Sequence, residues 1–325
     1  MRRSTLMSTL ILAAGMVLAT TPVRADTPAR PGTVNYVEGA VAMGGQSLDA
    51  KSTGMELGVG QSMTTLNGKA EILLTPGVFV RLGPNSSLKM IAAGLTDTEI
   101  QLEQGRAMIE VDQIFPENHL RVTQGTFAVD LQKKGLYDFD AARNQVRVFD
   151  GEALITEGSR RIEIKGGHDV NLAMGADVKA RGFDKKAFED DLYNWSSLRS
   201  SYLAEANIGE ARIYANAPGF WGANWYWNPW FDAYTFIPGD GFFYNPFGWG
   251  FYSPWFVYQA PYFGYYGGHR SFVHYAPSRA FVTANRAGLG YRSGMAAAPA
   301  FRAGFAGGGF RAGGFGGGGF HGGRR

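Results

Sequence analysis

Between Thr33 and about Leu172 the chain alternates short apolar and polar positions, and glycine or Asn and Asp turns interrupt the runs. Val146 and Val148, for example, lead to a turn at Asp150-Gly151. A period of two in β-branched residues is typical of half-buried strands. The pattern predicts a mainly β domain, built as a roll or sandwich or as a short β-solenoid.

The hydrophobic period changes after Asp184, which stands where a helix N-cap is expected. Apolar residues then recur near helical spacing, at Phe188, Leu192, Trp195, Leu198 and Tyr202. We expect one amphipathic helix, roughly 185–206, within a segment 183–212. Its apolar stripe is expected to pack on the β domain; binding of a partner is the alternative.

Residues 213–268 concentrate Trp, Tyr and Phe and repeat proline-aromatic pairs. Proline interrupts helices and strand ladders, so extended pieces joined by turns are expected. The aromatic residues have three candidate roles: stacking on sugar rings, lying at a membrane interface, or packing across the β domain. Residues 269–325 form a low-complexity Gly, Arg and Phe segment that predicts disorder. The domain is thus followed by an irregular aromatic, Gly-rich tail.

The net charge of +3 is unevenly distributed. No acidic residue follows Asp240 and no lysine follows Lys186. The full charges after Asp240 are the arginines at 270, 279, 286, 292, 302, 311, 324 and 325. A basic end indicates a polyanionic partner, such as acidic polysaccharide, lipid head groups or extracellular DNA. The alternative is that arginine keeps an apolar tail soluble.

The N-terminus carries the three parts of a secretory signal. Arg2 and Arg3 are the basic region, residues 6–19 are apolar, and cleavage is expected after Ala25. The apolar run is shorter than the ~20 residues of a spanning helix. We therefore expect a signal peptide at 1–25 and a periplasmic or secreted mature chain without a transmembrane span. The chain has no cysteine, which excludes disulfides and a lipid anchor on a mature N-terminal cysteine.

No residue pattern points to catalysis. The serines lie in no Gly-x-Ser-x-Gly elbow, and the histidines lack metal-ligand spacing on a regular element. Asp138 and Asp140 would share one strand face, as would suit a divalent cation; an exposed strand face is the alternative. We expect no catalytic, cofactor-binding or metal-binding residues and no enzyme activity.

The candidate contact residues are tryptophans of the aromatic segment and arginines of the tail. They are Trp225, Trp227, Trp230, Trp249, Trp255, Arg302, Arg311, Arg324 and Arg325. We expect them to contact an envelope polysaccharide or protein, or to mediate self-association, with peripheral membrane contact as a further alternative. The glycine-arginine tract is similar to RNA-binding segments, but export argues against intracellular nucleic acid.

A series of short motifs runs in order along residues 32–172. They are Gly32-Thr33-Val34 with Gly39-Ala40-Val41, Leu57 with Gly60, Leu102 to Ala107, Val122-Thr123 with Gly125 to Val129, and Val148 to Ala153. This order resembles the FecR-type domain, the periplasmic sensing domain of regulators that control extracytoplasmic-function sigma factors. The resemblance implies a FecR-like β domain at 26–180.

Regulators of that family carry a cytoplasmic anti-sigma segment and a membrane span before the domain, and here a leader stands in their place. Direct control of a sigma factor is therefore not expected. We expect an exported binding or envelope-structural module whose tail contacts a surface polymer or itself. The alternative is a periplasmic sensor that acts through a separate membrane partner.

Overall fold

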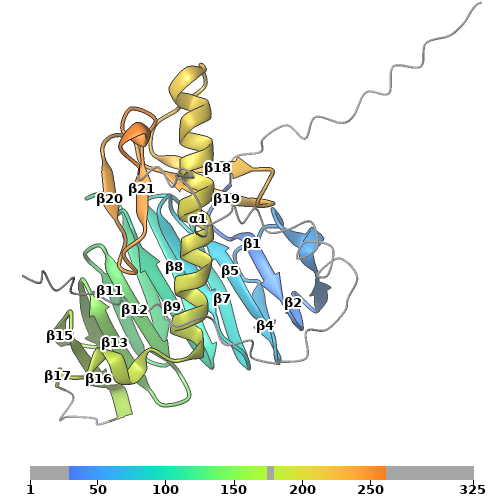
Figure 1. Ribbon diagram of the computed structural model, residues 1–325. Coiled ribbons are helices and arrows are strands. Elements are labelled where there is room, and N and C mark those ends of the chain that lie inside the picture. The colour runs from blue at the N-terminus through green and yellow to red at the C-terminus, as the bar shows by residue number, and fades with distance from the viewer. Residues whose placement is uncertain (1–28, 174–178, 261–325) are drawn as a thin grey trace, which may run out of the picture. The chain divides into compact units, whose positions relative to one another are not determined.

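The computed structural model of the protein describes residues 29–173 and 179–260. The expected leader at 1–25 and the segment 269–325, with its four candidate arginines, lie outside the described residues. Two β-sheets form the body of the described chain, and one long helix with two hairpins lies on one of them (Figure 1).

Sheet A has eight strands in the order β1-β5-β6-β9-β12-β13-β16-β17. They are β1 (Thr33–Glu38), β5 (Lys69–Leu73), β6 (Val78–Leu82), β9 (Arg106–Val111), β12 (Gly135–Asp140), β13 (Gln145–Asp150), β16 (His168–Asn171) and β17 (Arg181–Gly182). Sheet B has nine strands in the order β15-β14-β11-β10-β8-β7-β4-β2-β3. They are β2 (Val41–Met43), β3 (Gln46–Leu48), β4 (Ser62–Thr65), β7 (Ser86–Ala93), β8 (Asp97–Gln104), β10 (His119–Gln124), β11 (Phe127–Leu131), β14 (Glu152–Glu157) and β15 (Arg160–Lys165). A 3₁₀ turn, η1 (Ala50–Ser52), follows β3.

The chain passes back and forth between the sheets, mostly two strands at a time. The pairings within the sheets are antiparallel, except for the parallel pair of β8 and β10. The inner faces form one core, in which Ile72, Val80 and Ile109 of sheet A are buried with Leu88 and Ile100 of sheet B. The predicted mainly β fold is confirmed, and it takes the form of a sandwich.

The two sheets differ in their outer faces. Strand β8 alternates between buried and more exposed positions, as expected of a sheet with one face in water. Every residue of β6 and of β12 is buried. Both faces of sheet A are therefore covered in its centre.

The cover is the C-terminal part of the described chain, residues 191–260, which we call the cap. It comprises α1 (Asp191–Asn216), β18 (Asn224–Asn228), β19 (Ala233–Ile237), β20 (Phe242–Tyr244), β21 (Gly250–Tyr252) and the 3₁₀ turn η4 (Val257–Gln259). Figure 1 shows α1 lying across sheet A with the two hairpins beside it. Phe79 of β6 packs edge-on against Trp225 of β18 at 4.9 Å between ring centroids, in one cluster with Leu203 and Phe236. Packing across the β domain is thus the role that the structure gives to much of the aromatic segment.

The helix begins and ends later than expected. Asp184 caps the short 3₁₀ turn η3 (Lys185–Phe188), whereas the Asp190 carboxylate caps α1 by accepting from the amides of Leu192 and Tyr193. The helix then runs through Gly209 to Asn216, because tertiary contacts along the cap outweigh the low helix propensity of glycine. Among the described residues, no helix is both long enough and apolar enough to cross a membrane.

Candidate functional site

A row of side chains with alternating charge crosses the outer face of sheet A beneath the cap. Strand register places Glu71 opposite Arg81, Arg81 opposite Met108, Met108 opposite Asp138, and Asp138 opposite Arg147. Arg81 Nε donates to Glu71 Oε2 at 2.8 Å, and Arg147 Nη1 donates to Asp138 Oδ2 at 2.5 Å. These side chains are buried, so each charge depends on its partners.

The cap supplies polar partners to this row. Arg199 of α1 donates to Glu71 Oε1 at 2.9 Å, and Ser200 Oγ donates to Glu110 Oε1 at 2.9 Å. Asn245, in the turn between β20 and β21, donates to the same Glu110 oxygen. The helix and the second hairpin are therefore joined to the sheet through buried hydrogen bonds to charged groups, which are among the strong ones in proteins.

Amide side chains join the cap elements to one another and to the sheet. Asn207 of α1 donates to the carbonyls of Phe236 and Tyr252 and accepts from the Tyr252 amide at 2.8 Å. Asn35 of β1 donates to the Tyr234 carbonyl and accepts from its amide at 2.7 Å. Each of these asparagines satisfies buried backbone N–H and C=O groups that an apolar residue would leave without hydrogen-bond partners.

The charges under the cap have perturbed acidities. Burial opposes ionisation of Glu71, but the guanidinium groups of Arg199 and Arg81 outweigh it and hold the pKa of Glu71 below its ordinary value. Burial likewise opposes the charge of Arg81, yet Glu110 and Glu71 raise its pKa. This part of the row is a stabilised ionic network.

A second ionic cluster holds the start of α1. Arg106 of β9 pairs with Asp138 at 3.1 Å and with Asp190, the N-cap of α1. Burial raises the pKa of Asp138 in spite of Arg106 and Arg147. Asp140, in turn, pairs with Arg143 at 2.9 Å. The exposed strand face expected for Asp138 and Asp140 is therefore wrong, because both carboxylates are buried, and arginines occupy the positions that a cation would take.

Metal ligands do not gather elsewhere in the ranges 29–173 and 179–260, where no three His, Asp or Glu side chains form a cluster that could hold an ion.

Asp112, just after β9, is a buried carboxyl group without an ion-pair partner among the described residues. Its side chain is 1% exposed, and neither carboxylate oxygen has a hydrogen-bond partner. Burial and the neighbouring Glu110 raise the pKa of Asp112 well above its ordinary value. A buried carboxyl beside a like charge favours its neutral form.

The five candidate tryptophans fall in different environments. Trp225 is only 4% exposed and belongs to the core under the cap, so it is not a surface residue. Trp227 is half-buried and packs edge-on against Tyr234. Trp230, Trp249 and Trp255 are exposed, although Trp249 Nε1 donates to the Ser197 carbonyl of α1 at 3.1 Å.

Two exposed rings, those of Phe242 and Tyr244, lie on strand β20 of the second hairpin. Phe242 and Tyr244 point away from the core, with ring centroids 6.1 Å apart. Phe242 also stacks on Tyr252 at 5.4 Å and lies 6.3 Å from Phe256. We call the exposed Phe242 and Tyr244, with the half-buried Phe256, the aromatic face; Tyr252, only 2% exposed, packs against Phe242 from the core. The exposed Trp255 directly precedes Phe256 in the chain.

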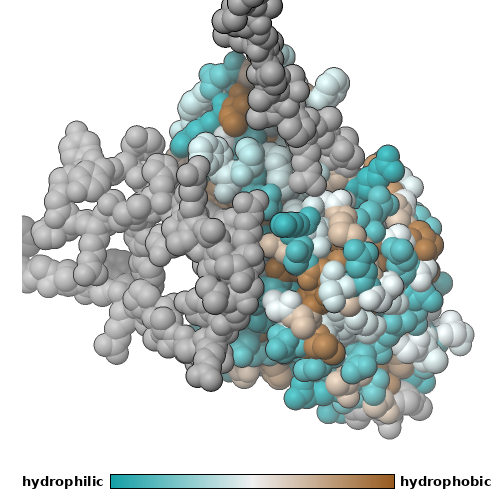
Figure 2. All heavy atoms as spheres, turned by 90° about the vertical axis from the view of Figure 1, so that its right-hand side faces the viewer, coloured by the Kyte–Doolittle hydropathy of each residue, from teal (hydrophilic) through white to brown (hydrophobic). Residues whose placement is uncertain are grey.

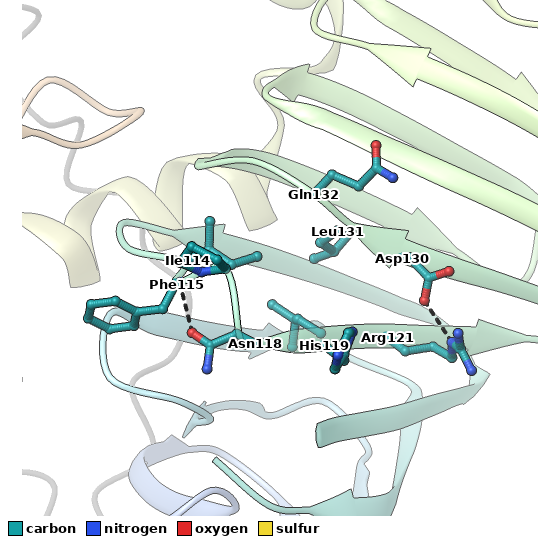
Figure 3. A pocket seen from close by; sticks show the side chains of 10 residues that line it. Ile114, Phe115, Asn118, His119, Arg121, Asp130, Leu131 and Gln132 are labelled. Carbon is teal, nitrogen blue, oxygen red and sulfur yellow. Dashed lines mark hydrogen bonds and ion pairs between the residues drawn. The ribbon is translucent and has the colours of Figure 1, made fainter. Parts of the chain in front are cut away.

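Other described surfaces are less distinctive. Figure 2 shows the side of the molecule near β2 and β4, where apolar residues occur as separate spots among polar ones. A depression of about 500 Å³ lies beside the start of β10, lined by Phe115, His119 and Gln132 among others. Its charged side chains, Arg121 and Asp130, pair with each other at 2.7 Å (Figure 3). The depression is thus open to solvent, and its two charged side chains neutralise each other.

These features define a β-sandwich whose outer sheet face is sealed by a helical and aromatic cap. Residues 61–154, from the start of β4 to the middle of β14, match the family described as FecR protein. The chain therefore carries a FecR domain, and the resemblance seen in its motifs is confirmed over that range.

Two solved structures are also similar, both of a "putative anti-sigma factor" from Parabacteroides distasonis ATCC 8503. One is 13% identical with a TM-score of 0.33 and covers 37% of this chain and 58% of that chain. The other is 12% identical with the same TM-score and covers 38% and 60%. The chain thus spans about three fifths of the solved chains that it matches. A comparison with curated proteins found no match.

Proposed function

We propose that the chain is an exported, non-enzymatic FecR-type module that works by binding, through rings that the cap holds at its surface. The observation that carries the proposal is the aromatic face. Phe242 and Tyr244 stand in contact and exposed, on a hairpin that Asn245 and Asn207 tie to the sheet and to α1. A fixed apolar surface of rings suits stacking on sugar faces or packing on a protein.

The FecR domain supports a signalling-related role and an export destination, because domains of this family are in general periplasmic. It favours a second candidate function, a sensor that passes an external signal to a separate membrane partner. In that case the same face would contact a protein instead of a surface polymer.

A pull-down of the exported chain from envelope fractions tests both candidates. Purified envelope polysaccharides and solubilised envelope proteins are offered separately to the wild type and to Tyr244→Ala. The proposal expects the substitution to weaken retention of one class by about fivefold, since an exposed ring contact contributes about 1 kcal/mol. The matched control is Leu95→Ala, which removes an exposed apolar side chain from the sandwich. Equal retention of wild type and Tyr244→Ala would contradict the proposal.

A further inference from the structure

We propose that the aromatic face of one copy of this chain binds the arginine-bearing segment 270–325 of a second copy, so that the protein self-associates head to tail. This inference rests on the proposed function, because it names a partner for the same face. The partner is identified by its chemistry, which is guanidinium groups on a segment without acidic residues.

The geometry of the hairpin leaves ring faces open to a partner. Along β20 the side chains alternate, so that Phe243 is directed to the interior and stacks on Phe251 at 5.6 Å and 6°. Phe242 and Tyr244 are directed outwards, and the Tyr244 side chain is 61% exposed. Guanidinium groups stack on aromatic rings with their planes exposed in this way.

The charges of the two parts are complementary. From 213 to 268 the chain has two charged residues, Asp232 and Asp240, and both are acidic. Asp240 is exposed and lies two residues before Phe242 in the chain. From 270 to 325 the full charges are arginines alone. The arginine-bearing segment and the segment that carries the aromatic face are therefore opposite in charge.

The chain already uses contacts of this kind. The Arg199 guanidinium lies 4.1 Å from the Tyr36 ring centroid, and the Arg147 guanidinium lies 4.2 Å from that of Phe188. On the hairpin itself, Lys134 Nζ lies 5.1 Å from the inward ring of Phe243. Cation-π contacts thus form within the cap interface, and the aromatic face offers further rings of the same type.

The number of arginines favours a partner in another copy. Eight arginines are spread along 270–325, at 270, 279, 286, 292, 302, 311, 324 and 325, whereas each chain has one aromatic face on its second hairpin. One face cannot occupy them all, so arginines remain for other copies, and multivalent binding strengthens with each added contact. A head-to-tail contact between unlike surfaces leaves one free surface at each end of a dimer, so that further copies add until a ring closes or the assembly stays open; assemblies larger than a dimer are therefore expected.

Sedimentation velocity of the purified full-length exported chain, over a range of concentrations, tests this inference. Wild type is expected to show a sedimentation coefficient that rises with concentration. Phe242→Leu/Tyr244→Leu keeps apolar bulk but removes two rings, and it should weaken self-association about tenfold. Substitution of the eight arginines by Gln should abolish it, and substitution by Lys should retain only part, because Lys stacks less well.

Leu95→Ala serves as the control and should associate like wild type. Circular dichroism melts establish that every variant is folded. A wild type that stays monomeric at all concentrations would overturn the inference, as would undiminished association in the ring variant or in the Gln variant. The envelope pull-down is repeated at a concentration where the chain is monomeric. If the wild type does not self-associate but still binds polymer through the aromatic face, this inference fails and the proposed function stands.

Discussion

Replacement of Asp112 by Asn should stabilise the protein at neutral pH. Asp112 is buried beneath the cap, neither of its carboxylate oxygens has a partner, and Glu110 lies beside it. The substitution keeps the shape of the side chain and removes its ionisation. It also removes the repulsion from Glu110, whose own partners are provided by Arg81, Ser200 and Asn245.

The magnitude and sign follow from the raised pKa. An unsatisfied buried polar group costs about 1–3 kcal/mol, and more when it is charged. Because the folded-state pKa of Asp112 lies above its ordinary value of 3.8, the folded state binds more protons, and wild-type stability falls as the pH rises from about 4 towards that raised pKa. At neutral pH we expect Asp112→Asn to add about 2 kcal/mol, which raises the Tm by roughly 4–8 °C in a domain of this size.

Urea unfolding at a series of pH values measures the effect. The free energy difference between Asp112→Asn and wild type should be small near pH 4 and should grow with pH until it levels off. Glu71 and Asp138 also have shifted pKa values, but their contributions to the pH dependence are the same in both proteins and cancel in this difference. Asp97→Asn, at an exposed position on β8, is the matched control and should give no such profile. A variant less stable than wild type at every pH would refute the reasoning.

Four further substitutions test the packing. Glu71→Gln leaves Arg199 without its charged partner and should lower the free energy of unfolding by about 3 kcal/mol in urea; a loss below about 1 kcal/mol would show that the network contributes little. Trp225→Ala should lower the free energy of unfolding by about 3–5 kcal/mol. Trp230, which is 76% exposed, is the control, and Trp230→Ala should lower it by less than about 0.5 kcal/mol. Equal losses for the two variants would contradict the assigned burial. Gly105→Ala should lower the Tm, because glycine has φ 76° there and an added Cβ would lie 2.6 Å from the backbone of β7; an unchanged Tm would show that the turn relaxes freely.

The strands were predictable because period-two alternation follows directly from the geometry of a pleated sheet, whereas the sequence left a roll, a sandwich and a solenoid open as ways of grouping them. Ile72 and Val80 face the core as their spacing indicates. The burial of both faces of sheet A is also indicated in the sequence, because Val78 to Leu82 is nearly continuous in apolar residues. That pattern does not say what covers the second face, because the cover comes from a part of the chain more than 100 residues away in sequence.

The interface of α1 was hidden because its buried positions include polar residues. Arg199, Ser200 and Asn207 lie on the stripe that faces the sheet and the hairpins, at helical spacing from Leu192 and Leu203. A search for apolar periodicity does not detect these polar residues. Their burial becomes favourable only through hydrogen-bond partners on other elements, which the local sequence does not show. The only signal in the sequence was charge at positions of strands that otherwise read as apolar, such as Arg81 within β6.

Composition alone could not separate the tryptophans. Trp225 and Trp230 belong to the same aromatic run, yet one is core and the other is exposed. The difference arises from the strand pairing of β18 with β19, which turns Trp225 towards Phe79. Exposure in such a segment depends on tertiary packing, which residue type does not reveal.

The buried charges explain why the cap has one position on the sheet. If α1 moved by one turn, Arg199 would leave Glu71 and Ser200 would leave Glu110, so two buried carboxylates would lose partners. The hydrophobic effect is non-directional and selects the position of a helix weakly, whereas an unpaired buried charge costs several kcal/mol. Because Asn245 bonds the same Glu110, a force on the β20–β21 hairpin is resisted by β9 in the centre of sheet A. A contact made by the aromatic face is therefore anchored in the FecR domain itself, and not in the hairpin alone.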